Sequence, residues 1–248
     1  EQNLSKEKVS YFLAEDHDRP TSLKTRFTID NQKMFRVSRL LKKPISEKIE
    51  NQIIKEIESK ADKTDAIIVS DFVYGVITPR VLNFIGNISQ RFNIMLIGDL
   101  QCSSQIGNVA KFKNFNLLTP TEKEARIAIG SEDEGIEWVS NQLIARTNCK
   151  HLLFKLGSDG LIAYTNQSIS RKRQYFPALC ANPLDTAGAG DALLASASCS
   201  LAVGNTLEEA AALGTLAASI VISKLGNVPL YKDELLEYMY KIIDEPKL

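Results

Sequence analysis

Short apolar runs alternate with helical segments along this chain, and this alternation limits its fold more than any other feature. The runs lie at residues 65–71, 93–99, 116–120 and 151–157. Each has the length and composition of a strand that is buried on both faces. Helical periodicity fills residues 46–61 and a segment that begins at Thr78-Pro79, where Thr is the predicted N-cap. This order predicts an α/β fold with a mostly parallel sheet between two helical layers.

Other elements complete this prediction. Residues 21–41 are expected to form a β-hairpin around an Asn31-Gln32 turn, because β-branched and aromatic residues flank that pair. Further helices are expected from residue 121, near residue 188, over 206–225 and over 232–243. Thr206 and Glu209 match a capping box, and Gly226 is the expected stop of that helix. We expect Trp138 and an isoleucine stripe at positions 49, 53 and 57 to lie in the core.

Composition excludes several classes of protein. Thirty basic and thirty acidic residues give zero formal net charge, whereas a general nucleic-acid binder needs an excess of Lys and Arg. No apolar run has the length of a membrane span, and the first residues lack a signal-peptide core. The four cysteines form no C-x-x-C motif, so we expect reduced thiols in a cytoplasmic protein. Only two histidines are present, which disfavours a histidine-rich metal site.

The segment Asp-Thr-Ala-Gly-Ala-Gly-Asp at residues 185–191 has the composition of an anion site. It places small residues directly before an apolar helix, whose first N–H groups have no partner in the helix. These amides and the helix dipole attract an anion, and small side chains let a phosphate reach the backbone. Asp191 would then lie beside the anion, where a carboxylate can accept a proton from an alcohol. The alternative is a glycine-rich turn in which Asp191 only complements the dipole.

This segment resembles the D-T-x-G-A-G-D signature of the ribokinase-like (PfkB) sugar kinases. The resemblance implies a ribokinase-like three-layer α/β/α sandwich in which the 21–41 hairpin is a small β lid. It implies ATP and Mg²⁺ as cofactors and Asp191 as the catalytic base. The anion hole for the transferred phosphoryl group would comprise Ala187, Gly188, Ala189 and Gly190.

The resemblance extends over nearly the whole chain. Further family segments follow in the expected order: KTR at 24–26, SDFVYGVITPRVL at 70–82, LLTPTEKEA at 117–125, FKLGSDG at 154–160 and SKLGN at 223–227. Their spacing is most similar to that in the kinase domain of the bifunctional heptose-7-phosphate kinase/ADP-heptose synthases. By this resemblance the nucleotide would be bound by Lys155, Gly157, Ser158, Gly160, Thr215 and Gly226.

The same resemblance implies substrate contacts from Lys24, Arg26 and Asp185, and a water-mediated contact of Glu124 with Mg²⁺. Each role has a plainer alternative. Lys24 and Arg26 are also compatible with a solvated strand face. Thr121 and Glu124 also match a helix capping box, and the glycines of 157–160 match an ordinary turn.

Several positions depart from the family pattern. Thr121 stands where the family has Asn, and Thr215 where an Asn is common. Gln101 and Tyr74 stand where the heptose kinases tend to have lysines, and each exchange removes a charge that can face phosphate. These changes support an alternative function, a catalytically impaired, kinase-derived module that binds nucleotide or mediates assembly.

Members of this family open with a βαβ region that contacts the sugar, and no matching segment precedes residue 21. Residues 1–248 are therefore expected to form one domain, the C-terminal portion of a kinase with its N-terminal part missing. A sheet without its first strands exposes an edge and an apolar face. We expect a homodimer or a partner segment to cover that face.

The leading hypothesis is an ATP- and Mg²⁺-dependent kinase that acts on a hydroxyl of a sugar or sugar phosphate, such as a heptose 7-phosphate. No nucleic-acid or membrane partner is expected. A dinucleotide-dependent dehydrogenase is disfavoured, because no G-x-G-x-x-G follows an early strand.

Overall fold

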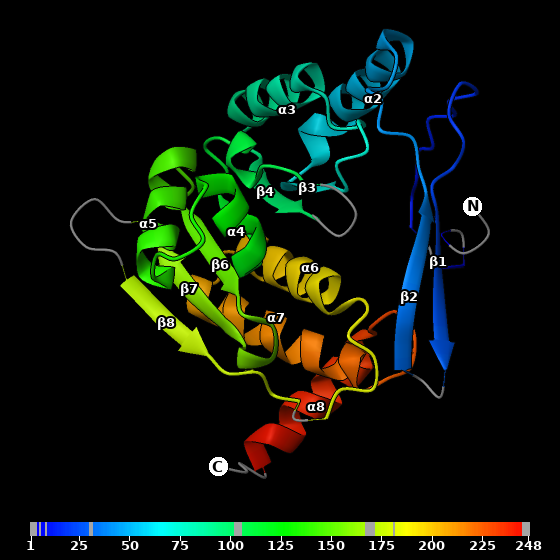
Figure 1. Ribbon diagram of the computed structural model, residues 1–248. Helices are drawn as coiled ribbons and strands as arrows, with labels where there is room; N and C mark the ends of the chain where they lie inside the picture. Colours follow the sequence, from blue (N-terminus) through cyan, green and yellow to red (C-terminus); the bar gives the residue numbers. More distant parts are fainter. Residues whose placement is uncertain are drawn as a thin grey trace. The chain divides into compact units, whose positions relative to one another are not determined.

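The computed structural model describes residues 4, 6–7, 9–29, 32–101, 106–166, 172–180 and 182–244 (Figure 1). The expected turn residue Asn31 and the thiol of Cys102 lie outside these residues. The described residues form two compact units. The first takes those of Glu1–Thr64 and Asp71–Ile94 together with Ile106, and the second takes Asp65–Ser70, Met95–Gln101 and those of Gly107–Leu248.

The first unit contains the expected hairpin and two helices. Strands β1 (Leu23–Ile29) and β2 (Gln32–Arg39) pair antiparallel, with an irregular register after Phe27. Helices α2 (Glu47–Lys60) and α3 (Pro79–Phe92) pack on each other. The predicted N-cap of α3 is confirmed, because the Thr78 hydroxyl accepts from the Val81 amide. The Glu50 carboxylate accepts from Thr78 and from Arg80, which joins the two helices.

The second unit is built on a six-stranded sheet in the order β3-β4-β5-β6-β7-β8 (Figure 1). Its strands are β3 (Ala66–Asp71), β4 (Met95–Leu100), β5 (Leu117–Leu118), β6 (His151–Lys155), β7 (Leu161–Thr165) and β8 (Lys172–Phe176). The pairs β4–β5 and β5–β6 are parallel, whereas β6–β7 and β7–β8 are antiparallel. The carboxyl ends of β4, β5 and β6 therefore meet at one edge, which is where such sheets bind ligands.

Helices cover both faces of this sheet. Helices α4 (Glu122–Ile129) and α5 (Ile136–Thr147) lie on one face, and α6 (Ala189–Ala202) and α7 (Leu207–Ile222) on the other (Figure 1). Successive side chains of β6 point to opposite faces of the sheet and so contribute to the core on both sides. Leu153 packs against α6 and α7, while Leu152 and Phe154 are buried on the opposite side. Helix α8 (Lys232–Asp244) packs against α7. The predicted three-layer α/β/α fold is confirmed.

Several local expectations were wrong. Trp138 lies on α5 with 42% of its surface exposed, so it is not a core residue. Of the isoleucine stripe on α2 only Ile49 is fully buried, because the rest of that face is half covered. Helix α7 has the predicted capping box, but it ends at Ile222 with Ser223 as C-cap. Gly226 follows with φ of +80° in the next loop.

No helix in the described part of the chain combines the length and the apolar content that crossing a membrane requires. Among the described cysteines, Cys149 is buried, Cys180 partly exposed and Cys199 exposed, and each is a free thiol here.

Burial of His151 predicts a pH-dependent stability. Desolvation at the start of β6, with a smaller contribution from Lys150, lowers the pKa of His151 to about 4, whereas an unfolded histidine has a pKa near 6.5. The folded state therefore binds fewer protons between these values, and stability falls as the pH drops from about 6.5 to 4. We expect urea unfolding to show a loss of about 2–3 kcal/mol from pH 7 to pH 4. The loss should shrink in His151→Gln, and an unchanged loss in that variant would contradict this origin.

Candidate active site

The start of helix α6 needs glycine at its N-cap. Gly188 has φ of +87°, the left-handed region that L-residues rarely adopt. A β-carbon at this position would also lie 2.3 Å from the Asn227 side-chain oxygen. The signature segment thus forms a tight turn that lets the side chain of Asn227 pack directly on the backbone.

The backbone amides of this turn divide into two groups. The Ala187 amide donates to Oδ1 of Asp185 at 2.9 Å, so in this structure it serves the turn itself and is not offered to an anion. The amides of Gly188, Ala189 and Gly190 are at the cap and first turn of α6, where the helix provides no internal acceptor. Three of the four predicted anion-hole positions are therefore placed to bind an anion at the positive end of the helix.

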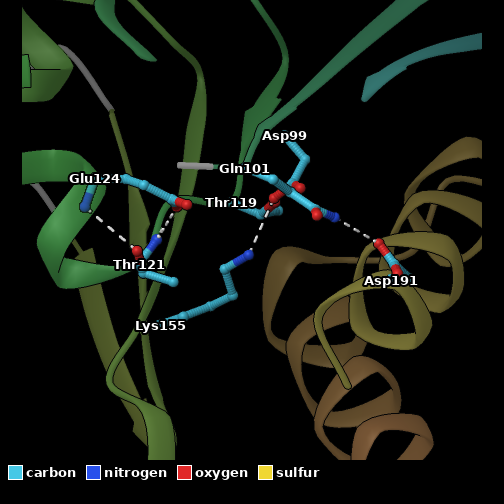
Figure 2. Close-up of polar contacts among 7 residues, drawn as sticks. All are labelled: Asp99, Gln101, Thr119, Thr121, Glu124, Lys155 and Asp191. Atoms are coloured by element: carbon cyan, nitrogen blue, oxygen red, sulfur yellow. Dashed lines mark hydrogen bonds and ion pairs between the residues drawn. The ribbon is translucent and has the colours of Figure 1, made fainter. Parts of the chain in front are cut away.

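Asp191 lies in the first turn of α6 with an exposed side chain. Its Oδ1 accepts a hydrogen bond of 3.0 Å from Nε2 of Gln101, 90 positions away in the sequence (Figure 2). Asp191 and Gly188 line a cavity of about 430 Å³, a volume typical of small-molecule sites. Its other walls come from α6, from Val221 of α7 and from the segment of 227–235, including Tyr231 and Leu235.

A polar network occupies the carboxyl ends of three neighbouring strands. Asp99 is on β4, Thr119 directly follows β5, and Lys155 ends β6. Nζ of Lys155 lies 3.0 Å from Oδ1 of Asp99, which also accepts from the Thr119 hydroxyl at 2.8 Å (Figure 2). Of these three only Lys155 was predicted as a site residue. Polar residues directly after buried strands were the available signal for Asp99 and Thr119.

Thr121 and Glu124 form the reciprocal capping box of α4. The Glu124 amide donates to the Thr121 hydroxyl, and the Thr121 amide donates to Oε2 of Glu124 (Figure 2). Glu124 is 8% exposed. Among the described residues no three His, Cys, Asp or Glu side chains gather as a metal site. Mg²⁺ is commonly held by one or two carboxylates, waters and phosphates, so a single glutamate fits it.

The remaining predicted nucleotide residues lie in three separate segments, the last being Gly226 in the loop after α7. Gly157 and Ser158 are in the short 3₁₀ helix η3 (Gly157–Asp159), which Gly160 ends. Thr215 is buried in α7, and its hydroxyl donates to the Ala211 carbonyl. None of these residues is among those that line the cavity beside Asp191, whereas Asn227, the neighbour of Gly226, is. Their contact with nucleotide stays a prediction.

Lys24 and Arg26 belong to the first unit. Both are on β1, where Arg26 is exposed and pairs with Arg36 across the hairpin. Nζ of Lys24 lies 4.5 Å from the ring centre of Phe72 and 5.2 Å from that of Tyr74, two cation–π contacts. The tyrosine that replaces a family lysine thus contacts a lysine from the hairpin. The role of Lys24 and Arg26 toward a substrate stays a prediction.

This fold and the position of the glycine-rich helix start define the class of protein. Solved ribokinase-like kinases share the architecture. A ribokinase from Giardia lamblia matches with a TM-score of 0.76 at 17% identity, over 97% of this chain and 78% of that one. Phosphofructokinase-2 from Escherichia coli matches with a TM-score of 0.75 at 17% identity, over 96% and 76% of the two chains. At these identities the comparison shows the fold.

The family follows from the sequence match. The model of the pfkB family carbohydrate kinases matches residues 1–232, and the chain belongs to this family. The bifunctional protein HldE of Wolinella succinogenes is 32% identical over 90% of this chain and 46% of its own length. The HldE protein of Helicobacter hepaticus is 28% identical over 94% of this chain and 47% of its own length. The chain thus spans about half the length of these curated relatives.

Proposed function

We propose that this chain is an ATP- and Mg²⁺-dependent kinase that phosphorylates a hydroxyl of a sugar or sugar phosphate, with a heptose 7-phosphate as the first candidate. The observation that carries the proposal is the start of α6. There Asp191 and the Gly188–Gly190 amides lie within a single helical turn beside a cavity. The similarity to HldE proteins supports a heptose phosphate as the acceptor.

The geometry supports transfer in a single step. The acceptor oxygen attacks the γ-phosphorus of ATP, and its proton passes to a carboxylate oxygen of Asp191. The bond from that phosphorus to the bridging oxygen breaks, and ADP leaves. The amides of Gly188–Gly190 donate to the non-bridging oxygens, which stabilises their charge. Gln101 donates to Oδ1 of Asp191 and thereby fixes the orientation of the base.

Mg²⁺ neutralises phosphate charge when it is bound, and Glu124 would hold it through water. A carboxylate offers about four acceptor positions, so Glu124 can accept from water while its Oε2 accepts from the Thr121 amide. Asp185 is the proposed sugar contact in the second unit, and its Oδ1 already braces the turn through Ala187.

The direct test is turnover. ADP release should be measured with MgATP and a panel of free and phosphorylated sugars, heptose 7-phosphates included. We expect turnover with at least one phosphorylated sugar that is well above the rate without acceptor. Equal rates with and without every acceptor would contradict the proposed function.

One alternative has its own support, a kinase-derived module that binds nucleotide or mediates assembly without turnover. Thr121 replaces the family Asn, and the capping box of α4 already engages both Thr121 and Glu124. Exposed apolar side chains on β1 and β2 also suit a homodimer or a covering partner segment. They are Leu23, Phe27, Ile29, Met34, Phe35 and Val37.

Thermal unfolding with MgATP separates these functions. A ligand at a hundred times its Kd adds about 2.7 kcal/mol of stability, so MgATP should raise the Tm by several degrees. ATP without Mg²⁺ should give a smaller rise, since the proposed site binds the metal–phosphate complex. No shift with MgATP would favour the assembly module, and a shift without turnover on any sugar would favour a binding module.

A further inference from the structure

The network of Asp99, Thr119 and Lys155 contains a buried ion pair. The Asp99 side chain is 3% exposed and the Lys155 side chain 16% exposed, and Thr119 is fully buried. Moving two charges out of water costs more than a surface pair does, and apolar packing of similar volume is often at least as stable. Stability alone therefore does not explain an ion pair at this edge of the sheet.

The ammonium group of Lys155 lies close to the start of helix α6. Lys155 at the end of β6 reaches Asp99 on β4 across the intervening strand β5 (Figure 2). Its Nζ lies 3.6 Å from the point where a β-carbon on Gly190 would be. Gly190 is in the first turn of α6, so the ammonium lies beside the positive end of the helix dipole. Two positive groups at such a distance repel each other, and an anion between them would relieve the repulsion.

Three hydrogen bonds hold the Lys155 ammonium in this position. Lys155 is fixed through its backbone by the bond from its amide to the Pro120 carbonyl, and through its side chain by Asp99. Thr119 donates to the same Asp99 oxygen and so fixes the carboxylate. The ammonium is thereby pre-positioned beside Gly190 in the first turn of α6, with little reorganisation left for the reaction.

We propose that Lys155 binds the transferred phosphoryl group itself, and that Asp99 and Thr119 are positioning residues for its ammonium. This inference rests on the proposed function and gives Lys155 a role in the transition state of the proposed phosphoryl transfer. During transfer Lys155 stays protonated and donates N–H hydrogen bonds to the non-bridging oxygens of the γ-phosphoryl group. The acceptor proton still passes to Asp191, and ADP is still the leaving group.

The test compares Lys155→Met with Lys155→Arg on the full chain. Lys155→Met keeps the length of the side chain and removes its charge, so kcat should fall by about 10²–10³-fold, the usual effect of losing one such donor. The KM for MgATP should stay within a few-fold, because the contact strengthens only in the transition state. Lys155→Arg should retain more kcat than Lys155→Met. Lys150→Met is the matched control, an exposed lysine beside the opposite end of β6, and should match wild type.

Two further variants keep the test valid if Lys155→Met folds poorly. Lys155→Met with Asp99→Asn leaves no unpaired buried charge and should fold while staying as slow as the single variant. Thr119→Val should lower kcat by a smaller factor, with KM for MgATP unchanged. As a binding readout, aluminium fluoride should tighten MgADP binding to wild type and much less to the charge-free variants.

The outcomes separate the two proposals. Turnover by wild type with normal kcat in the Lys155→Met variants would overturn the role of Lys155 and leave the kinase function standing. A rise in KM for MgATP at unchanged kcat would also overturn it, since it would show a ground-state nucleotide contact. If wild type has no turnover, equal binding of aluminium fluoride with MgADP by wild type and the charge-free variants would overturn it as well.

Discussion

Replacing Asp191 with asparagine should lower kcat for sugar phosphorylation by about 10²–10⁴-fold, the contribution expected of a positioned general base. Asparagine has the same shape as aspartate, and its side-chain oxygen still accepts the hydrogen bond that Gln101 donates to Oδ1. The substitution therefore removes proton acceptance and leaves the geometry of the turn. Initial rates at saturating MgATP and acceptor measure the effect.

The matched control for this variant is Asp233→Asn. Asp233 is also an exposed aspartate in the first turn of a helix, α8, and it does not line the cavity beside Asp191. Both variants should lose a similar, small helix-dipole stabilisation of about 0.3–1 kcal/mol, while only Asp191→Asn should lose kcat. A kcat of Asp191→Asn within a few-fold of wild type would show that another group takes the proton.

The largest expected effect on stability is at Gly160, which ends η3 before β7. Its backbone has φ of +88° and ψ of −133°, a region that is nearly exclusive to glycine. A β-carbon there would also lie 2.1 Å from the Phe176 carbonyl oxygen and 2.7 Å from the Ala178 amide nitrogen. Both contacts are with backbone, which cannot move aside as a side-chain end can. Gly160→Ala should therefore destabilise the fold by about 3–5 kcal/mol.

Gly157→Ala provides the comparison within the same turn. Gly157 also has a positive φ of +65°, but a β-carbon there meets nothing within 4 Å. Its cost should be only that of the left-handed backbone, about 1–2 kcal/mol. Urea unfolding of the two variants measures both values. Equal losses would contradict the proposed backbone clash at Gly160.

Much of the fold was predictable because its signals are local. Helix periodicity, caps such as Thr78, Thr121 and Thr206, and apolar runs such as 151–157 each depend on residues that are close in sequence. Helix α5 and strand β8 were not predicted. The hydrophobic face of α5 is mixed with polar residues and leaves Trp138 exposed, and β8 presents charged side chains to solvent. The apolar residues of α5 at 136, 139, 143 and 144 do follow helical spacing, so its local signal was present and was missed. Strand β8 has neither alternation nor a continuous apolar run.

Part of the candidate site could likewise be predicted from local sequence signals, and part could not. The segment 185–191 by itself predicted a tight turn before a helix, which the structure confirms, and an anion site with a neighbouring carboxylate, which stays a prediction. The reason is that the conformational freedom of glycine and the unpaired amides of a helix start are properties of adjacent residues. Family membership rests on the match of residues 1–232 to the family model, which includes this segment.

Only the tertiary structure decided which side chains meet at that turn. Gln101 reaches Asp191 across 90 positions, and Lys155 reaches Asp99 across 56. These contacts require that β4, β5 and β6 be neighbours and parallel, which brings their carboxyl ends to one edge. Periodicity identifies each strand but not its neighbours, because strand order is set by long-range packing of the helices on the sheet. The same packing buries the Lys155–Asp99 pair and places its ammonium beside the start of α6.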